Sequence, residues 1–249
     1  MTRALVTGAS AGLGRAIAER LAAEGHDVTG VDRDHPGAEA PFAHIACDLA
    51  DRDSVDALAA RLIEDGPFDQ TVLNAGISAT GPFEAIPAKA HARVMAVNAE
   101  APMVLCAALA RAGALSRGGR VVFVSSLSHF TGYPGAASYA AAKDALAVYA
   151  RSIRKPFART LGVTVSAAFP GPLRTDHAAR HAPAGADAEK RMAPDVAARL
   201  ILAEAARGRA VIVPGARARW MALAGRIAPA AVTGAMRRIV YDKLDRAVW

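Results

Sequence analysis

The chain has 249 residues, 53% of them hydrophobic and 21 of them glycine, which suits one globular α/β domain and argues against extensive disorder. The formal net charge is +7, and residues 215–249 hold seven basic against two acidic residues, so the remainder is nearly balanced and general nucleic-acid binding has little support. Because no signal-peptide core and no apolar run of about 18 residues occur, we expect a soluble cytoplasmic protein.

The first predicted elements are a buried strand at residues 3–6, a glycine-rich turn reading TGASAGLG at 7–14, and an amphipathic helix from Arg15. This order is the context that a phosphate-binding loop requires. Gly8 permits a tight turn, Gly12 lets the backbone approach a pyrophosphate, and Gly14 allows close packing of helix on strand. The glycine spacing differs from that of the commonest dinucleotide fingerprint, so a purely structural turn stays an alternative.

The next strand, residues 27–31, ends in Asp32. A carboxylate at the tip of the second strand can accept hydrogen bonds from an adenosine ribose and would repel a 2′-phosphate. The sequence therefore predicts NAD as the cofactor. Arg33 and Arg15 carry guanidinium groups that could reach a phosphate, and they keep NADP open.

Further strands follow at residues 44–47 and 71–73, separated by a helix at 54–64. Asp48 and Leu49 end the first of these strands, where an adenine ring would lie, and the turn at residues 74–76 ends the second. Strands that alternate with helices predict a parallel sheet covered on both faces, with ligands at the carboxyl ends of the strands. Cys47 and Cys106 lack metal-type spacing, so we expect no disulfide framework, no zinc site and no other metal.

Residues 89–114 are predicted to form one long helix or two, with Asn98 inside, and the pattern alone favours a solvent-facing Asn98. A strand at 120–124 ends at Ser126. The segment from 127 to 137 is expected to be a loop, and it could return Ser126 to the helix that follows. That helix, 138–160, carries Tyr139 and Lys143 on one face, one turn apart. An ammonium near a phenol lowers the cost of ionising it, so the pair is a candidate acid/base device, although chance also produces such pairs.

After a strand at 163–169, the turn from Pro170 to Thr175 is expected at the nicotinamide, and 176–192 are expected to form a mobile lid. His177 and His181 stand four apart but have no third metal ligand nearby. A helix at 194–206 and a last strand at 211–215 complete the pattern.

Together these motifs resemble the short-chain dehydrogenase/reductase family. The matching elements are the loop at 7–14, Asn74-Ala75-Gly76, Asn98, Ser126, Tyr139-x-x-x-Lys143 and Pro170-Gly171, and they span residues 3–214. The resemblance implies a Rossmann-type fold, a doubly wound parallel sheet of about seven strands with helices on both faces. One departure is His129, which stands where many members of the family have glycine.

The resemblance also implies roles for four catalytic residues. Tyr139 is the general acid/base, Ser126 binds the reacting oxygen, and Asn98 anchors a water in a proton relay. Lys143 holds the nicotinamide ribose and depresses the phenol pKa. Taken with the residue patterns, the predicted cofactor contacts are Gly8, Ser10, Gly12, Leu13, Gly14, Asp32, Arg33, Asp48, Leu49, Asn74, Ala75, Gly76, Tyr139, Lys143, Pro170, Gly171, Leu173 and Thr175.

The implied activity is that of an NAD(P)-dependent oxidoreductase that interconverts a small-molecule secondary alcohol and a ketone in a homo-oligomer, a dimer or a tetramer. The alternative is a regulatory protein that binds a dinucleotide without turnover. Loss of a catalytic residue would favour the alternative, and all four are present.

We expect residues 1–215 to form the dinucleotide-binding and catalytic domain and residues 216–249 to be its basic, helical C-terminal extension. Trp220, Leu223, Ala224 and Ile227 recur at helical intervals there, and Pro229 and Gly234 are expected to separate a second helical stretch at 236–247. The extension could pack on a partner subunit, cover the substrate pocket, or lie on an anionic membrane surface. The first two are the favoured interpretation.

Overall fold

A computed structural model describes residues 2–183, 185–244 and 247–249, and in this part of the chain seven parallel strands form one sheet in the order β3-β2-β1-β4-β5-β6-β7. The strands are β1 (Arg3–Thr7), β2 (Asp27–Asp32), β3 (Ala43–Ala46), β4 (Phe68–Leu73), β5 (Leu115–Val124), β6 (Thr164–Ala168) and β7 (Val211–Ile212). The strand order reverses between β1 and β4, the point at which such sheets open a crevice for ligands. The predicted Rossmann-type doubly wound sheet is confirmed.

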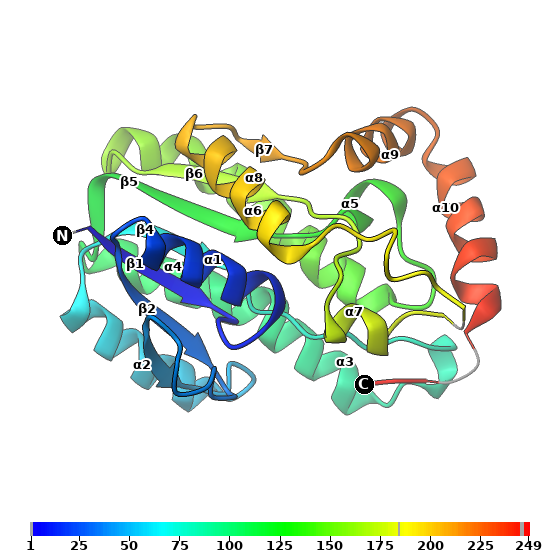
Figure 1. Cartoon of the computed structure of the whole chain (residues 1–249), viewed down its shortest axis with the longest axis horizontal. Helices are drawn as coiled ribbons and strands as arrows, with labels where there is room; N and C mark the ends of the chain where they lie inside the picture. The colour runs from blue at the N-terminus through cyan, green and yellow to red at the C-terminus, as the bar shows by residue number, and fades with distance from the viewer. Residues whose placement is uncertain (1, 184, 245–246) are drawn as a thin grey trace.

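Helices cover both faces of the sheet (Figure 1). One face carries α1 (Gly12–Ala23) and α8 (Pro194–Ala206), and the other carries α2 (Arg52–Asp65), α4 (Ala101–Arg111) and α6 (Ala137–Thr160). Alternate strand residues supply the two cores: Val6 and Val122 pack against α1 and α8, whereas Leu5 and Phe123 pack on the opposite side. Full burial of each such side chain contributes about 1.5–3 kcal/mol of hydrophobic stabilisation.

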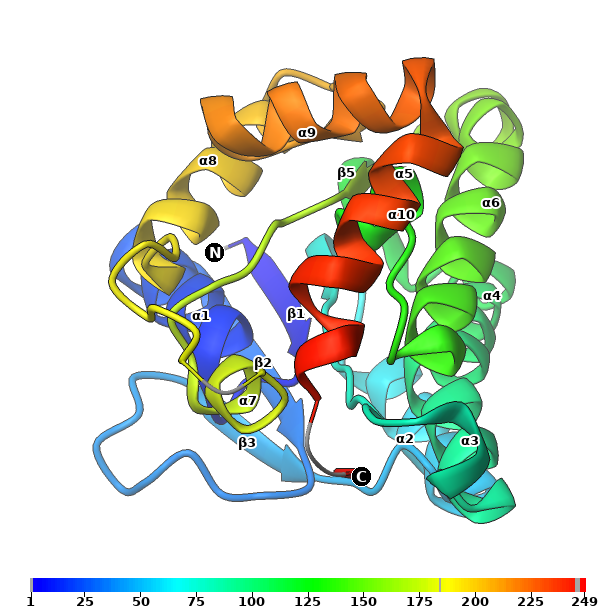
Figure 2. The same cartoon turned by 90° about the vertical axis from the view of Figure 1, so that its right-hand side faces the viewer.

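The remaining elements lie mostly at the carboxyl end of the strands. They are η1 (Phe83–Ala85), α3 (Ala88–Met95), the π-helical turn η2 (Ala96–Glu100), α5 (Ser128–Thr131), α7 (Asp176–Arg180), α9 (Ala216–Ile227), α10 (Pro229–Ile239) and η3 (Tyr241–Lys243). Figure 2 looks towards this end of the molecule, with α9 along the top and α10 crossing in front of the sheet. The C-terminal helices therefore stand beside the region in which the sequence motifs converge.

Two boundaries differ from the sequence-based expectations. The expected loop at 127–137 contains the short helix α5, because a turn of backbone hydrogen bonds forms directly after Ser126. The second C-terminal helix begins at Pro229 and ends at Ile239, with Gly234 inside it. Pro229 does separate the two helices, since α9 ends at Ile227 and proline opens α10, where its missing N–H costs nothing, but reading Gly234 as part of the break was wrong. Asp245 and Arg246, which the expected helix included, lie outside the described residues.

One segment, residues 88–111, has the length and hydropathy of a membrane-spanning helix, and 56% of its apolar window is buried inside the protein. It comprises α3, η2 and α4, whose side chains Val97, Leu105 and Leu109 lie in the core against the sheet. Burial of this kind is that of a core helix.

Candidate active site

The glycine-rich loop joins β1 to α1 and needs glycine for steric reasons. Gly8 and Gly12 have φ angles of +72° and +56°, in the left-handed region. A Cβ on Gly14 would lie 1.9 Å from the carbonyl oxygen of Gly8. The residue before α1, Ala11, offers no side-chain cap, so the first amides of the helix stay available to an anion. The loop fits the pyrophosphate of a dinucleotide.

Asp32 at the tip of β2 is held by backbone amides beside this loop. Its carboxylate accepts hydrogen bonds from the Ser10 amide at 3.0 Å and the Asp34 amide at 3.3 Å. The two arginines that could have met a 2′-phosphate have partners of their own. Arg33 pairs with Asp34 at 3.3 Å, and Arg15 pairs with Glu19 at 2.7 Å. The Asp32 carboxylate is therefore held in a fixed position at the tip of β2.

At the end of β3, side-chain contacts within the protein hold Asp48 and Leu49. Asp48 accepts hydrogen bonds from the Ala50 amide at 3.0 Å and from Arg93 at 2.8 Å, and the Leu49 side chain is buried in the core. Their side chains hold β3 to α3, so an adenine would meet the backbone here. Leu13, in the first turn of α1, is also buried and packs in the core between α1 and the sheet.

The turn after β4 is tied to the glycine-rich loop by a residue that the sequence analysis did not assign to the site. The Thr7 hydroxyl accepts hydrogen bonds from the amides of Asn74 at 3.0 Å and Ala75 at 3.1 Å. Asn74 Nδ2 donates back to the Thr7 carbonyl at 3.0 Å. A threonine at a strand end directly before Gly8 was the available signal for this link.

Asn98 lies in the π-helical turn η2 and is completely buried. Its Oδ1 accepts from the Ile77 amide and its Nδ2 donates to the Ile77 carbonyl, both at 2.8 Å. The solvent-facing orientation that the pattern favoured is wrong, because the widened helical turn directs the amide to the segment after β4. A Cβ on Gly76 would lie 3.0 Å from Lys143 Nζ and 3.5 Å from Asn98 Oδ1, so these three residues meet.

Lys143 and Tyr139 project from the first turns of α6. Lys143 is 3% exposed, and its ammonium donates to the Val124 carbonyl at 2.8 Å. Burial lowers the pKa of Lys143 to about 8. The Ser125 hydroxyl donates to the Lys143 carbonyl at 2.8 Å and ties the helix to the end of β5. Lysine is thus held at the carboxyl edge of the sheet in a partly neutralised state near pH 8.

Burial raises the pKa of the Tyr139 phenol, and a hydrogen bond with Ser126 opposes that effect. Ser126 follows β5, and its hydroxyl accepts from the Ser128 amide at 3.2 Å at the start of α5. Serine and tyrosine therefore meet although they come from different elements. The lowering of the phenol pKa by Lys143 that the resemblance implies stays a prediction.

The segment after β6 packs against the glycine-rich loop. Thr175 lies against the loop, its Cγ2 3.1 Å from where a Cβ on Gly12 would stand, and its hydroxyl caps α7 by accepting from the Ala178 amide at 3.1 Å. Leu173 pairs with Met192 in a parallel bridge. Gly171, next to Pro170, packs near Leu127. These residues stand where the resemblance expects the nicotinamide carboxamide.

Two histidine positions are explained by contacts within the chain. His129 Nδ1 lies 2.9 Å from an Asp144 carboxylate oxygen, and its ring packs 5.1 Å from that of Phe169, so it fills the space beside β6. His181 is buried, with Nδ1 2.8 Å from the Thr80 hydroxyl. His181 and His177 have ring centroids 4.7 Å apart, and the described residues contain no cluster of three or more metal-ligating side chains.

A parallel sheet, a glycine-rich loop at its reversal point, and a meeting of serine, tyrosine, lysine and asparagine define a Rossmann-type dinucleotide-dependent enzyme. The family model of the short chain dehydrogenases matches residues 2–184. The chain belongs to the short-chain dehydrogenase/reductase family, and the resemblance drawn from its motifs is confirmed.

Curated relatives and solved structures agree with this assignment. The chain is 35% identical over 173 residues to the 3-oxoacyl-[acyl-carrier-protein] reductase MabA of Mycobacterium avium, covering 69% of this chain and 67% of the relative. It is 33% identical over 181 residues to the corresponding FabG of Escherichia coli K12, covering 70% and 74%. The chain is therefore an oxidoreductase that binds a nicotinamide dinucleotide and acts on a small molecule.

Among solved structures, a short-chain dehydrogenase from Sphingobium yanoikuyae in complex with NADPH is similar with a TM-score of 0.76 and 28% identity, covering 91% of this chain and 94% of the other. A bulky-bulky ketone specific alcohol dehydrogenase from Comamonas testosteroni has a TM-score of 0.74 and 26% identity, covering 96% and 95%.

Proposed function

We propose that the protein interconverts a secondary alcohol and a ketone, with Ser126, Tyr139, Lys143 and Asn98 as its catalytic residues. The observation that carries this proposal is their convergence: Ser126 lies close enough to the Tyr139 phenol to lower its pKa, and Gly76 stands between Lys143 and Asn98. The bound nicotinamide supplies or accepts the hydride. The protein's own residues must then bind the substrate oxygen and move one proton.

The two hydroxyls divide that work. Ser126 donates a hydrogen bond to the substrate oxygen and holds it beside the phenol, where charge develops in the transition state. Tyr139, whose pKa is raised by burial, keeps its proton at neutral pH and transfers it to the oxygen in reduction. In oxidation the same oxygen returns the proton. Lys143 and Asn98 stand behind the phenol, where a water chain can carry the proton to solvent.

We further propose that Asp32 selects NAD over NADP. Its carboxylate is fixed by the Ser10 and Asp34 amides, and the residue before Gly12 is an alanine without charge. A 2′-phosphate at this position would face the carboxylate without a dedicated cation. The Sphingobium neighbour was solved with NADPH, so the proposal rests on Asp32 and the two amides that hold it, and not on the comparisons.

Residues 216–249 are proposed to belong to the same domain and to cover the substrate pocket beside the segment that follows Ser126. The Thr233 hydroxyl of α10 donates to the Thr131 carbonyl at 3.2 Å, and the Thr80 amide donates to the Val248 carbonyl at 2.8 Å. We also propose that the protein is cytoplasmic and forms a homo-oligomer.

The test is oxidation and reduction of a substrate panel followed at the nicotinamide absorbance, with NAD(H) and NADP(H) in parallel. The panel includes 3-oxoacyl thioesters and bulky ketones, because those are the substrates in the names of the relatives and of the Comamonas neighbour. Oxidation of a secondary alcohol or reduction of a ketone, seen as a change in nicotinamide absorbance, supports the proposal. Tight dinucleotide binding without turnover of any panel member would favour the regulatory alternative.

A further inference from the structure

Helix α9 packs on the protein through its smallest residues. Ala218, Ala222 and Gly225 are buried and lie on one side of the helix. The contact is close, since a Cβ on Gly225 would stand 1.9 Å from the carbonyl oxygen of Phe130 in α5. The helix is therefore fixed against the segment that follows Ser126, and its opposite side faces solvent.

That opposite side carries the large apolar residues. Trp220 is 72% exposed, Leu223 45% and Ile227 75%. Spacings of three and four residues place them in one stripe along the helix. The sequence pattern favoured this stripe as a packing face, and within the chain that is wrong: alanine and glycine make the contact, whereas tryptophan, leucine and isoleucine point outward.

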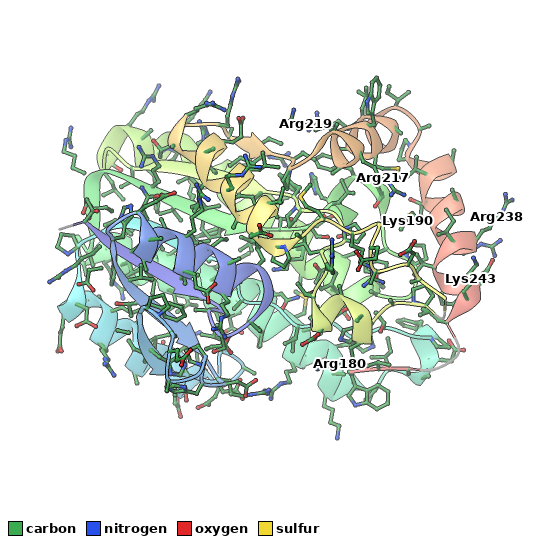
Figure 3. The ribbon with its side chains drawn as sticks, viewed as in Figure 1. Arg180, Lys190, Arg217, Arg219, Arg238 and Lys243 are labelled. Atoms are coloured by element: carbon green, nitrogen blue, oxygen red, sulfur yellow. The ribbon has the colours of Figure 1, made fainter. Side chains whose placement is uncertain are left out.

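Arginines accompany the stripe. Arg217, Arg219 and Arg226 lie in α9, and residues 216–241 contain five arginines and no aspartate or glutamate. The guanidinium of Arg226 lies over the Phe130 ring, 4.7 Å from its centroid, so Arg217 and Arg219 are the α9 arginines available to an outside partner. Among the described residues, no carboxylate lies within 4.0 Å of these five guanidinium groups. Figure 3 shows Arg217 and Arg219 beside α9 in the upper part of the molecule, and Arg238 and Lys243 at its right-hand end. An apolar stripe thus lies within a cationic surface.

We propose that the outward face of α9 binds an anionic lipid surface, with Trp220, Leu223 and Ile227 inserted at the level of the headgroups and the arginines on lipid phosphates. An apolar stripe with arginines and a tryptophan is the composition of helices that lie in the membrane interface. This contact goes beyond the proposed catalytic function and does not depend on it.

The charge distribution favours a lipid surface over a second copy of the chain. In a two-fold contact whose axis passes through this face, the same patch meets itself and α9 would lie on α9. Arg217 and Arg219 would then meet their counterparts without carboxylates in α9 or α10 to pair with. An anionic bilayer supplies the missing charge and accepts the apolar stripe at the same time.

The test is flotation of the full-length protein with vesicles of phosphatidylcholine alone or mixed with phosphatidylglycerol. We expect binding to the anionic vesicles only, and release as salt is raised, since the Debye length falls from about 10 Å at 0.1 M to about 3 Å at 1 M. Changing Arg217→Gln or Arg219→Gln should each lower the partition coefficient about fivefold, from about 1 kcal/mol per basic residue. Trp220→Ser should abolish binding at moderate salt.

Phe83→Ser is the matched control, because Phe83 is 70% exposed and lies in η1, away from α9 in sequence. It should bind vesicles as the original chain does. A second measurement leaves the stripe intact. The chain has two tryptophans, so the Trp249→Phe variant keeps Trp220 as its single tryptophan. The fluorescence of Trp220 should then shift to shorter wavelength when anionic vesicles are added.

Absence of binding to anionic vesicles at low salt overturns the proposal, as does equal loss of binding in the Phe83→Ser control. The oligomeric state, measured by light scattering without lipid, supplies another decisive outcome. If Trp220→Ser converts an oligomer into smaller species, the stripe is a subunit interface and the lipid proposal falls. An unchanged mass together with lost vesicle binding supports it.

Discussion

The ammonium of Lys143 donates a 2.8 Å hydrogen bond to the carbonyl oxygen of Val124. This contact joins α6 to the end of β5 and fixes the lysine at the carboxyl edge of the sheet. Since burial lowers the pKa of Lys143 to about 8, the group carries its charge at neutral pH and loses it in mild alkali. The bond fixes the lysine one helical turn after Tyr139 in α6.

Replacing Tyr139 by phenylalanine should remove the proton donor and leave the cofactor cradle intact. We expect kcat to fall by about 10²–10⁴, the usual contribution of a positioned acid or base, with little change in dinucleotide affinity. Steady-state kinetics and titration of cofactor binding would check this. Tyr149→Phe is the matched control on the same helix, because its hydroxyl reaches only the Met103 carbonyl, at 3.4 Å. A Tyr139→Phe variant with near-normal kcat would contradict the assignment.

The raised pKa of Tyr139 sets a direction for the pH dependence of catalysis. Below that pKa the fraction of phenolate grows about tenfold with each pH unit, so oxidation, which needs the base, should speed up as pH rises. Reduction needs the protonated phenol and should slow as the pKa is passed. Profiles of kcat/KM in both directions would show opposite slopes. Parallel profiles would exclude the phenol as the titrating group.

Much of the site was predictable because its residues sit at positions that local rules govern. Gly8, Gly12 and Gly14 follow a strand and open a helix, and Tyr139 and Lys143 are one helical turn apart. Strand, loop and helix assignments of this kind depend on neighbours in sequence. The order of motifs along the chain was therefore enough to predict both the fold and the family.

Orientations that depend on distant parts of the chain were not predictable. Asn98 faces inward because η2 is a π-helical turn packed under the segment after β4, and no local pattern signals that turn. The stripe of Trp220 and Ile227 has the period of a helix, but the period does not say which face packs. The close approach of Gly225 to the Phe130 carbonyl fixes which face of α9 packs on the protein.

Removing the carboxylate of Asp32 should relax the choice of cofactor. We expect the ratio of kcat/KM for NAD over NADP to fall by about tenfold in Asp32→Ala, which corresponds to about 1.4 kcal/mol. The reason is loss of the ribose acceptor and of its repulsion of a 2′-phosphate. Kinetics with both cofactors would measure the ratio.

The control for this variant is Asp34→Ala, whose carboxylate is exposed and pairs with Arg33. Removing it takes away a surface ion pair without touching the Ser10 amide. The cofactor ratio should stay close to that of the original chain. If the two variants shift the ratio equally, net charge and not the ribose contact is responsible.

The buried pair of His181 and Thr80 predicts acid sensitivity of the fold. Burial first, then the neighbouring charges of His177 and Arg180, lower the pKa of His181 from 6.5 to about 4. Between these values the unfolded chain binds the extra proton and the folded chain does not. Stability should therefore fall as pH drops from 6.5 to 4, by on the order of 1–3 kcal/mol.

Urea unfolding at several pH values would measure this loss. His181→Gln has no proton to bind, so its stability should depend less steeply on pH in the same window, although it is less stable near neutrality. His35→Gln is the control, because His35 is exposed, and its acid slope should match that of the original chain. If His181→Gln keeps the full slope between pH 6.5 and 4, other groups cause the acid sensitivity and His181 is protonated in the folded state.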